Sequence, residues 1–135
     1  LIGKNEDELI LNIFLENGDN IIISQTNNIV SSGNGGRISI TKNNFIQLGG
    51  YDESFYPMGY QDYDLIERAN VFGLKYINID KNNKAIINSK KESIKNIGIK
   101  MEYNKMNNIN KLLSKLNINN NNLKVNLIRG IGICI

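Results

Sequence analysis

Two acidic residues separated by one position are the best candidates for acid–base chemistry in this sequence. Asp62 and Asp64 open a segment, residues 62–72, whose apolar side chains fall on one helical face before Gly73. The first N–H groups of a helix lie unpaired at the positive end of its dipole, so we expect a carboxylate there to be ionised and oriented. Such a carboxylate can act as a general base and remove a proton from a hydroxyl group. The structural alternative is that Asp62 only caps the helix and that Asp64 pairs with Arg68.

The elements that would position this helix start alternate between strands and helices. Apolar or alternating runs predict strands at 9–15, 21–24, 37–41, 74–79, 85–87 and 123–128. Helices are predicted at 42–48, 62–72 and 93–116, and loops at 25–36, 51–60 and 117–122, the last an asparagine-rich tract. Asn17-Gly18 is typical of a hairpin turn between the first two strands, and Thr41 is expected to cap the helix at 42–48. This order favours an α/β or α+β sheet over a helical bundle or a β-sandwich.

The composition is that of a globular domain. The chain has 135 residues, enough for one domain and hardly for two. Hydrophobic residues make up 41% and charged residues 21%, which allows a buried core. The net charge of +3, from 16 Lys and Arg against 13 Asp and Glu, is too small to favour a nucleic-acid-binding module. There is no His and the single Cys is Cys134, which excludes zinc sites, His-based triads and an internal disulfide within this sequence.

Several motifs around the acidic pair follow one another in a specific order. They are a Gly-Gly pair at 35–36, a helix containing Phe45, a Gly-Gly-Tyr-Asp-Glu turn at 49–53 and a Gly-Tyr-Gln-Asp-Tyr-Asp-Leu helix start at 59–65. This order resembles the acceptor-side half of GT-A glycosyltransferases. It is similar to the β-1,4-galactosyltransferase and N-acetylgalactosaminyltransferase group and to family 2 glycosyltransferases. The close match spans residues 35–73. The resemblance implies an α/β fold, the C-terminal half of a GT-A fold with a mixed sheet and flanking helices, in a single partial domain over 1–135.

The resemblance also assigns roles on the acceptor side. Asp62 matches the general base that deprotonates the acceptor hydroxyl as it attacks the anomeric carbon of a nucleotide sugar. Gln61 stands where the family usually has a Glu that hydrogen-bonds the acceptor, and its amide can still bind hydroxyls. Met58 lies where the galactosyltransferases have a sugar-contacting Trp. Because Met stacks poorly on a pyranose, Tyr56 or Tyr60 is expected to supply the aromatic surface.

Other positions that match the family's motifs concern the donor sugar, a second acidic residue and a metal. Gly35 and Gly36 match a strand start where the backbone comes close to the donor sugar, and the alternative is that they simply end a loop. Asp64 matches a later acid of the motif; it is a candidate substrate-binding residue and is more consistent with orienting the loop, either through Arg68 or through the backbone. Asn88 falls near a metal-binding His of the galactosyltransferases, where an amide is a poorer ligand.

In the turn, aromatic and acidic side chains are expected to be structural. Tyr51 and Phe55 are predicted to pack within the loop, and Asp52 and Glu53 to hold the turn by hydrogen bonds to the backbone.

The implied reaction is an inverting transfer of a sugar, galactose or N-acetylgalactosamine, from a UDP-sugar to a hydroxyl of a saccharide or glycoconjugate. A divalent metal, Mn²⁺ or Mg²⁺, is expected from the resemblance. The family's Asp-x-Asp metal motif is missing here. It is expected upstream of Leu1 in a longer protein, so this piece alone is expected to be inactive. The alternative function is a non-catalytic sugar-binding or scaffold relative.

The location of the protein is only weakly indicated. No apolar run could cross a bilayer and no signal-peptide pattern opens the chain. Membrane association of the full-length protein is compatible with the resemblance, whereas nucleic acid is not an expected partner. The resembling families work in the bacterial cytoplasm or the Golgi lumen, and the absence of Asn-x-Ser/Thr sites favours the cytoplasm.

Overall fold

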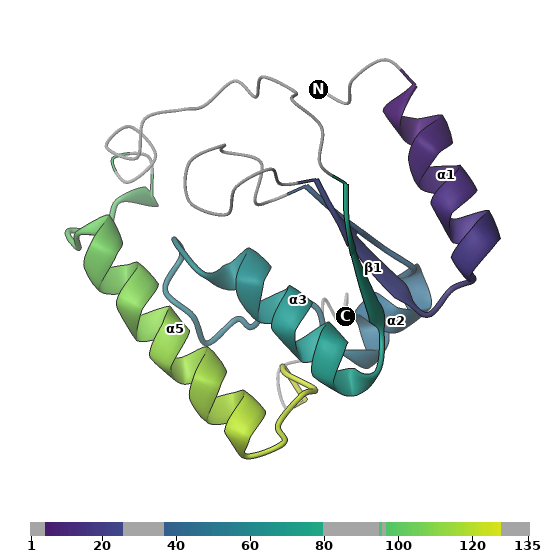
Figure 1. Cartoon of the computed structure of the whole chain (residues 1–135). Coiled ribbons are helices and arrows are strands. Elements are labelled where there is room, and N and C mark those ends of the chain that lie inside the picture. Colours follow the sequence, from purple (N-terminus) through teal and green to yellow (C-terminus); the bar gives the residue numbers. More distant parts are fainter. Residues whose placement is uncertain (1–4, 26–36, 80–94, 96, 128–135) are drawn as a thin grey trace, which may run out of the picture.

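The computed structural model describes residues 5–25, 37–79, 95 and 97–127 (Figure 1). Its elements are α1 (Glu6–Asn17), β1 (Ile21–Ser24), β2 (Ile38–Ile40), α2 (Lys42–Gln47), α3 (Gln61–Phe72), β3 (Lys75–Asn78) and α5 (Tyr103–Asn119). The loop predicted at 25–36 lies almost entirely outside the described residues, as does the strand predicted at 85–87. Among the described residues, no helix is long and apolar enough to span a bilayer.

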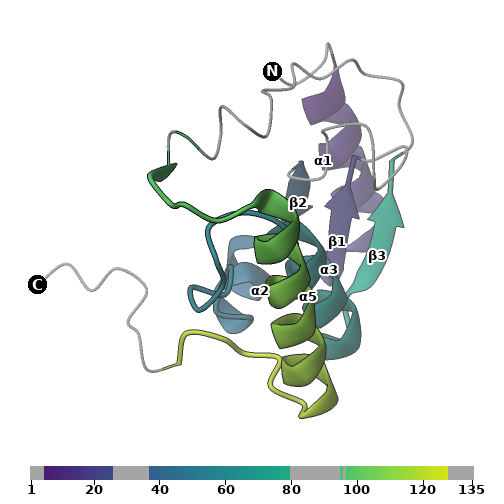
Figure 2. The same cartoon turned by 90° about the vertical axis from the view of Figure 1, so that its left-hand side faces the viewer.

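The three described strands form a mixed sheet in the order β2-β1-β3. β1 pairs antiparallel with β2, with Ile22 opposite Ile40, and parallel with β3, with Ile22 opposite Tyr76. α1 lies on one face of the sheet, α3 lies on the other, and α5 packs on the far side of α3 (Figures 1 and 2). Every residue of β1 is buried because the strand is central and covered on both faces. This is the predicted α/β architecture, a mixed sheet with flanking helices.

The core lies between the sheet and α3. Five fully buried apolar residues form its centre: Ile22, Leu48, Leu65, Ala69 and Leu74. Leu65 and Ala69 are one helical turn apart, as expected for the buried face of an amphipathic helix. Burial of each large apolar side chain adds about 1.5–3 kcal/mol to the free energy of unfolding. This cluster therefore holds α3 against the sheet.

The local signals around α2 and α3 are confirmed. The Thr41 hydroxyl accepts a hydrogen bond from the Asn44 N–H, the expected cap of α2. α3 runs from Gln61 to Phe72, and Gly73 caps its end in the left-handed conformation with a φ of 112°. The strand predicted at 74–79 is β3.

The strand predicted at 9–15 is wrong, because this segment belongs to α1. Asp7 and Glu8 lie in the first helical turn, where the dipole favours acidic residues, and the apolar run that follows lacks a period of two. Gly18, with φ 76°, ends the helix and donates its N–H to the Phe14 carbonyl at 2.8 Å. Asn17-Gly18 is therefore a helix end, because a glycine that adopts a positive φ can end a helix as well as form a hairpin turn.

The C-terminal predictions need three corrections. α5 begins only at Tyr103, since Gly98 has φ 72° and interrupts the segment predicted to be helical from residue 93. The helix continues to Asn119, so the tract at 117–122 is only partly a loop. Residues 123–127 form no strand. They lie against the turn after α2 instead, where the Val125 N–H donates to the Leu48 carbonyl at 3.1 Å.

Candidate active site

The predicted base, Asp62, is the second residue of α3 and is half-buried. Burial raises the pKa of the Asp62 carboxyl above its ordinary value of 3.8, and a hydrogen bond from the Tyr51 side chain opposes this shift. The helix start alone predicts a carboxyl that favours its ionised form, whereas loss of solvation dominates in the structure. A higher pKa makes the deprotonated carboxylate a stronger base.

Tyr51, in the loop after α2, holds this carboxylate in place. Burial and the nearby charge of Asp62 raise the pKa of Tyr51 to about 12, so its phenol keeps the proton that it donates to Asp62. The Tyr51 ring packs edge-on against Phe45, with centroids 5.9 Å apart and planes at 72°. Tyr51 thus packs against α2 rather than within its own loop, and its side chain stays partly exposed. Sequence reasoning missed the contact with Asp62, because nothing in the spacing of the two residues indicates it.

The chain enters α3 through two residues in the left-handed conformation, Gly59 with φ 90° and Tyr60 with φ 67°. For a residue with a Cβ this conformation costs about 1–2 kcal/mol, so contacts must hold Tyr60 in place. Its hydroxyl donates to Glu67 Oε1 at 3.1 Å, and its ring centroid lies 5.5 Å from that of Tyr63. Burial and the charge of Glu67 raise the pKa of Tyr60 to about 12. The Tyr60 side chain is therefore held in one orientation at the start of α3, and its role toward a sugar stays a prediction.

The neighbouring residues that are predicted to bind the acceptor already make some contacts within the protein. Gln61 Nε2 donates to the Tyr56 carbonyl at 2.9 Å. The Gln61 oxygen, Oε1, is not used in that bond and is the atom that could accept from a ligand hydroxyl. Met58 is half-buried, and the Tyr56 side chain is exposed.

Asp64 points into the interior and is not exposed. Its Oδ2 lies 2.7 Å from Arg68 Nε, and neither side chain is accessible to solvent. Burial raises the pKa of Asp64, while the charge of Arg68 and its hydrogen bond to Asp64 oppose the shift. The geometry fits the structural role predicted for Asp64 through Arg68 and corrects its assignment as a direct substrate contact, because a completely buried carboxylate cannot touch a bound sugar.

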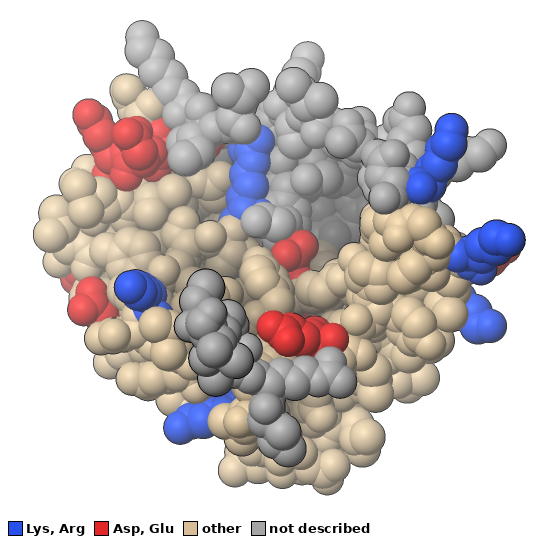
Figure 3. All heavy atoms as spheres, turned by 180° about the vertical axis from the view of Figure 1, so that it is seen from behind, with Lys and Arg blue, Asp and Glu red and all other residues tan. Residues whose placement is uncertain are grey.

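Further polar groups lie at the carboxyl ends of the parallel strands β1 and β3, where ligands of open α/β sheets commonly bind. Ser24 Oγ is 2.7 Å from the Tyr76 hydroxyl and 3.4 Å from Asn78 Oδ1. The pKa of Tyr63 is raised, mainly by burial and next by the charge of Asp62. Tyr76 also raises this pKa. The polar residue that ends the apolar run 21–23 could have suggested this cluster. Figure 3, the view from behind Figure 1, shows acidic side chains near the centre of that face.

Three predicted site residues, Gly35, Gly36 and Asn88, lie outside the described residues. Their roles toward donor and metal therefore remain predictions. Within the described ranges, no group of three or more Asp, Glu or Cys residues could hold a metal ion.

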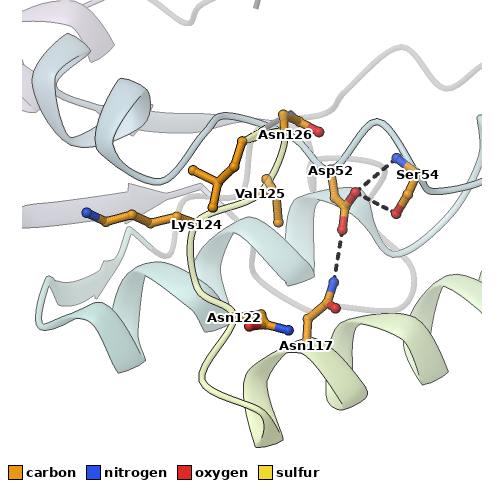
Figure 4. A pocket seen from close by; sticks show the side chains of 8 residues that line it. Asp52, Ser54, Asn117, Asn122, Lys124, Val125 and Asn126 are labelled. Carbon is orange, nitrogen blue, oxygen red and sulfur yellow. Dashed lines mark hydrogen bonds between the residues drawn. The ribbon is translucent and has the colours of Figure 1, made fainter. Parts of the chain in front are cut away.

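A separate cavity of about 430 Å³ lies beside the turn at residues 52–54 (Figure 4). It is lined by Asp52, Ser54, Asn117, Asn122, Lys124, Val125, Asn126 and Leu127. Asp62 is not among these residues. Asp52 Oδ1 accepts from the Ser54 N–H and hydroxyl at 2.9 and 2.6 Å, and Asp52 Oδ2 accepts from Asn117 at 3.0 Å. Asp52 therefore holds the turn, as predicted, and its oxygens are already used.

Comparison with known proteins gives one match. The model of a family described as glycosyltransferase like family 2 matches residues 5–129. No curated protein and no solved structure matches the chain. The matched range includes every described element and the whole of the candidate site.

Proposed function

This chain belongs to the glycosyltransferase like family 2, and from this premise we propose that Asp62 is the general base of an inverting sugar transfer. Membership supports glycosyl transfer in general, from a nucleotide-sugar donor to a carbohydrate acceptor. The mixed sheet with flanking helices is consistent with part of a GT-A fold. The observation that carries the role of Asp62 is its half-buried carboxyl at the start of α3, with a raised pKa and oriented by Tyr51.

In the proposed reaction, Asp62 accepts the proton of an acceptor hydroxyl. The acceptor oxygen forms a bond to the anomeric carbon while the bond from that carbon to the diphosphate oxygen breaks, and UDP leaves with the electron pair. A single displacement of this kind inverts the anomeric configuration. UDP-galactose and UDP-N-acetylgalactosamine are the proposed donors, and a saccharide or glycoconjugate is the proposed acceptor. Tyr60, Met58 and Gln61 would bind the acceptor, and correct positioning supplies much of the rate enhancement.

The expected divalent metal does not fit the described residues. They contain no group of three or more acidic or Cys side chains that could hold an ion. No step of the reaction is therefore derived through a metal. We propose that any metal is bound mostly by residues outside the described ranges.

A non-catalytic sugar-binding role is the second candidate. Its support is Gln61, which stands in the acceptor-binding position as an amide and whose nitrogen is bonded to the Tyr56 carbonyl rather than directed outward. The retained Asp62 favours the enzyme.

The test compares the full-length protein with its Asp62→Asn variant. UDP release is measured with UDP-galactose and UDP-N-acetylgalactosamine, with Mn²⁺, and with a panel of monosaccharide acceptors. Loss of a general base is expected to lower the transfer rate roughly 10²–10⁴-fold. Asp7→Asn, the same change at an exposed position in α1, should keep the wild-type rate. Unchanged transfer by Asp62→Asn would remove Asp62 from the mechanism, and saccharide binding without turnover in the wild type would favour the non-catalytic role.

A further inference from the structure

Asn110 in α5 has a completely buried side-chain amide, and among the described residues this amide bonds only to the backbone of the loop before α3. Its Oδ1 accepts from the Tyr56 N–H at 2.8 Å. Its Nδ2 donates to the carbonyls of Tyr56, Met58 and Gly59 at 3.0, 3.3 and 2.7 Å. An Asn side chain has two N–H donors, so these three carbonyls share them. One side chain therefore fixes the backbone over the last part of the loop.

The loop has little freedom to move away from α5. A Cβ on Gly59 would lie 2.7 Å from the Cβ of Asn107, so the two backbones approach as closely as glycine allows. Two helical turns beyond Asn110, on the same face of α5, Asn117 Nδ2 donates to Asp52 Oδ2 at 3.0 Å. The helix thus holds the first part of the loop through Asn117 and the last part through Asn110.

The segment fixed by Asn110 carries the side chains assigned to the acceptor. Met58 and Tyr60 flank Gly59, and the Tyr56 carbonyl that accepts from Asn110 also accepts from Gln61 Nε2 at 2.9 Å. We propose that Asn110 is a positioning residue for acceptor recognition, acting through the backbone of residues 56–59. This inference rests on the proposed function, and no contact between Asn110 and the sugar is required.

The chemistry of this contact suggests a sharp substitution. Asn110→Asp keeps the size of the side chain and an acceptor for the Tyr56 N–H, but it replaces the amide donor by an oxygen that faces three carbonyl oxygens. The matched control is Asn108→Asp, which makes the same charge change at an exposed position of the same helix. Both variants are made in the full-length protein and compared with wild type.

Two measurements are made on each variant. Hydrogen exchange by mass spectrometry follows residues 51–60, with residues 61–72 as the internal reference. UDP release from UDP-galactose without acceptor gives the rate of donor hydrolysis. The same assay at increasing concentrations of the best monosaccharide acceptor of the panel gives kcat and KM for transfer. Loss of the buried bonds in Asn110→Asp is expected to speed exchange in 51–60 and to raise the acceptor KM, each about tenfold or more. Donor hydrolysis and the exchange of 61–72 should match those of Asn108→Asp.

Three results would overturn the proposal. Unchanged exchange in residues 51–60 would show that the amide does not hold the loop. Faster exchange with an unchanged acceptor KM would show that the held loop is irrelevant to the acceptor. Equal losses of donor hydrolysis and transfer would indicate general damage to the fold. If the wild-type protein transfers no sugar at all, the proposed function fails and the acceptor role of Asn110 fails with it, while the exchange result still decides whether Asn110 holds the loop.

Discussion

Arg68 Nε lies 2.7 Å from Asp64 Oδ2, one helical turn earlier in α3, and both side chains are fully buried. The same guanidinium donates to the carbonyls of Leu48, Gly50 and Leu123 at 2.9, 2.7 and 3.3 Å. A buried charge is tolerated when it is paired and hydrogen-bonded, and the partners of Arg68 come from α3, from the turn after α2 and from the segment after α5. One side chain therefore joins three distant parts of the chain beneath the candidate site.

Removing this cation should be strongly destabilising. Arg68→Met leaves the Asp64 carboxylate buried without its partner, which is expected to lower the free energy of unfolding by about 3–5 kcal/mol. Urea unfolding followed by far-UV circular dichroism measures the change. Lys105→Met, at an exposed position in α5, should stay within about 0.5 kcal/mol of wild type. A loss of similar size in both variants would contradict a special role for Arg68.

Gly49 and Gly18 allow backbone strain to be separated from steric overlap. Their φ angles are nearly equal, 77° and 76°, but a Cβ on Gly49 would lie 2.0 Å from the Val125 carbonyl oxygen, whereas nothing lies within 4 Å of one on Gly18. We expect Gly18→Ala to lower the free energy of unfolding by about 1–3 kcal/mol, because the positive φ and extended ψ of Gly18 form a conformation that residues with a Cβ rarely adopt. Gly49→Ala should lower the free energy of unfolding by about 1–3 kcal/mol more than Gly18→Ala does, because its new Cβ overlaps Val125. If urea unfolding shows the same decrease in the free energy of unfolding for both variants, residues 123–126 do not pack closely against the turn at Gly49.

The parts of the fold that the sequence predicts correctly depend on contacts close in the chain. Thr41 caps α2 within one turn, and the Asp64–Arg68 pair lies within α3. The misread helix α1 shows the limit of such signals, because Gly18 suits either a hairpin or a helix end. Tertiary packing, which short-range patterns do not contain, decides between the two.

Tyr51→Phe should change the pH dependence of the proposed reaction. The Tyr51 hydrogen bond stabilises the ionised form of Asp62 and lowers its pKa, so its loss raises that pKa further. The acidic limb of kcat/KM against pH is therefore expected to move to higher pH. Tyr56→Phe, which removes a hydroxyl from an exposed ring of the same loop, should leave the limb in place. A limb that stays fixed or moves to lower pH in Tyr51→Phe would contradict the proposed arrangement.

Asp62→Asn should increase stability while it removes activity. The folded-state pKa of Asp62 is raised above its ordinary value of 3.8, so the folded chain binds the proton more tightly than the unfolded chain. For such an acid, stability is fully present below the unfolded pKa and is lost as the pH rises through the folded pKa. Near neutral pH the neutral amide avoids this loss, and the free energy of unfolding should exceed that of wild type.

Urea unfolding of Asp62→Asn and wild type at about pH 7 and at about pH 3 checks this prediction, because both side chains are neutral at the lower pH and the difference should vanish there. Asp7→Asn, at an exposed position, serves as the control. A variant that is less stable than wild type near neutral pH would show that the Asp62 carboxylate is not penalised by burial.

The site itself is only partly readable from the sequence. The sequence brings Asp62, Gln61 and Tyr60 together at the start of α3, since neighbours in the chain lie close in space, and their roles stay predictions. Asn110 is different: it lies 54 positions from Tyr56, and a buried Asn in an asparagine-rich helix looks like its exposed neighbours. Only the packing of α5 on the loop distinguishes it.

The contacts of residues 123–126 affect where this protein can be shortened. The Leu123 carbonyl accepts from Arg68 at 3.3 Å, and Asn126 Nδ2 donates to the carbonyls of Gly49 and Tyr51 at 2.7 Å each. A truncation designed at the end of α5, the last described helix, would delete these partners and uncover the turn that carries Tyr51. The smallest recombinant piece that preserves the geometry around Asp62 must therefore include Asn126.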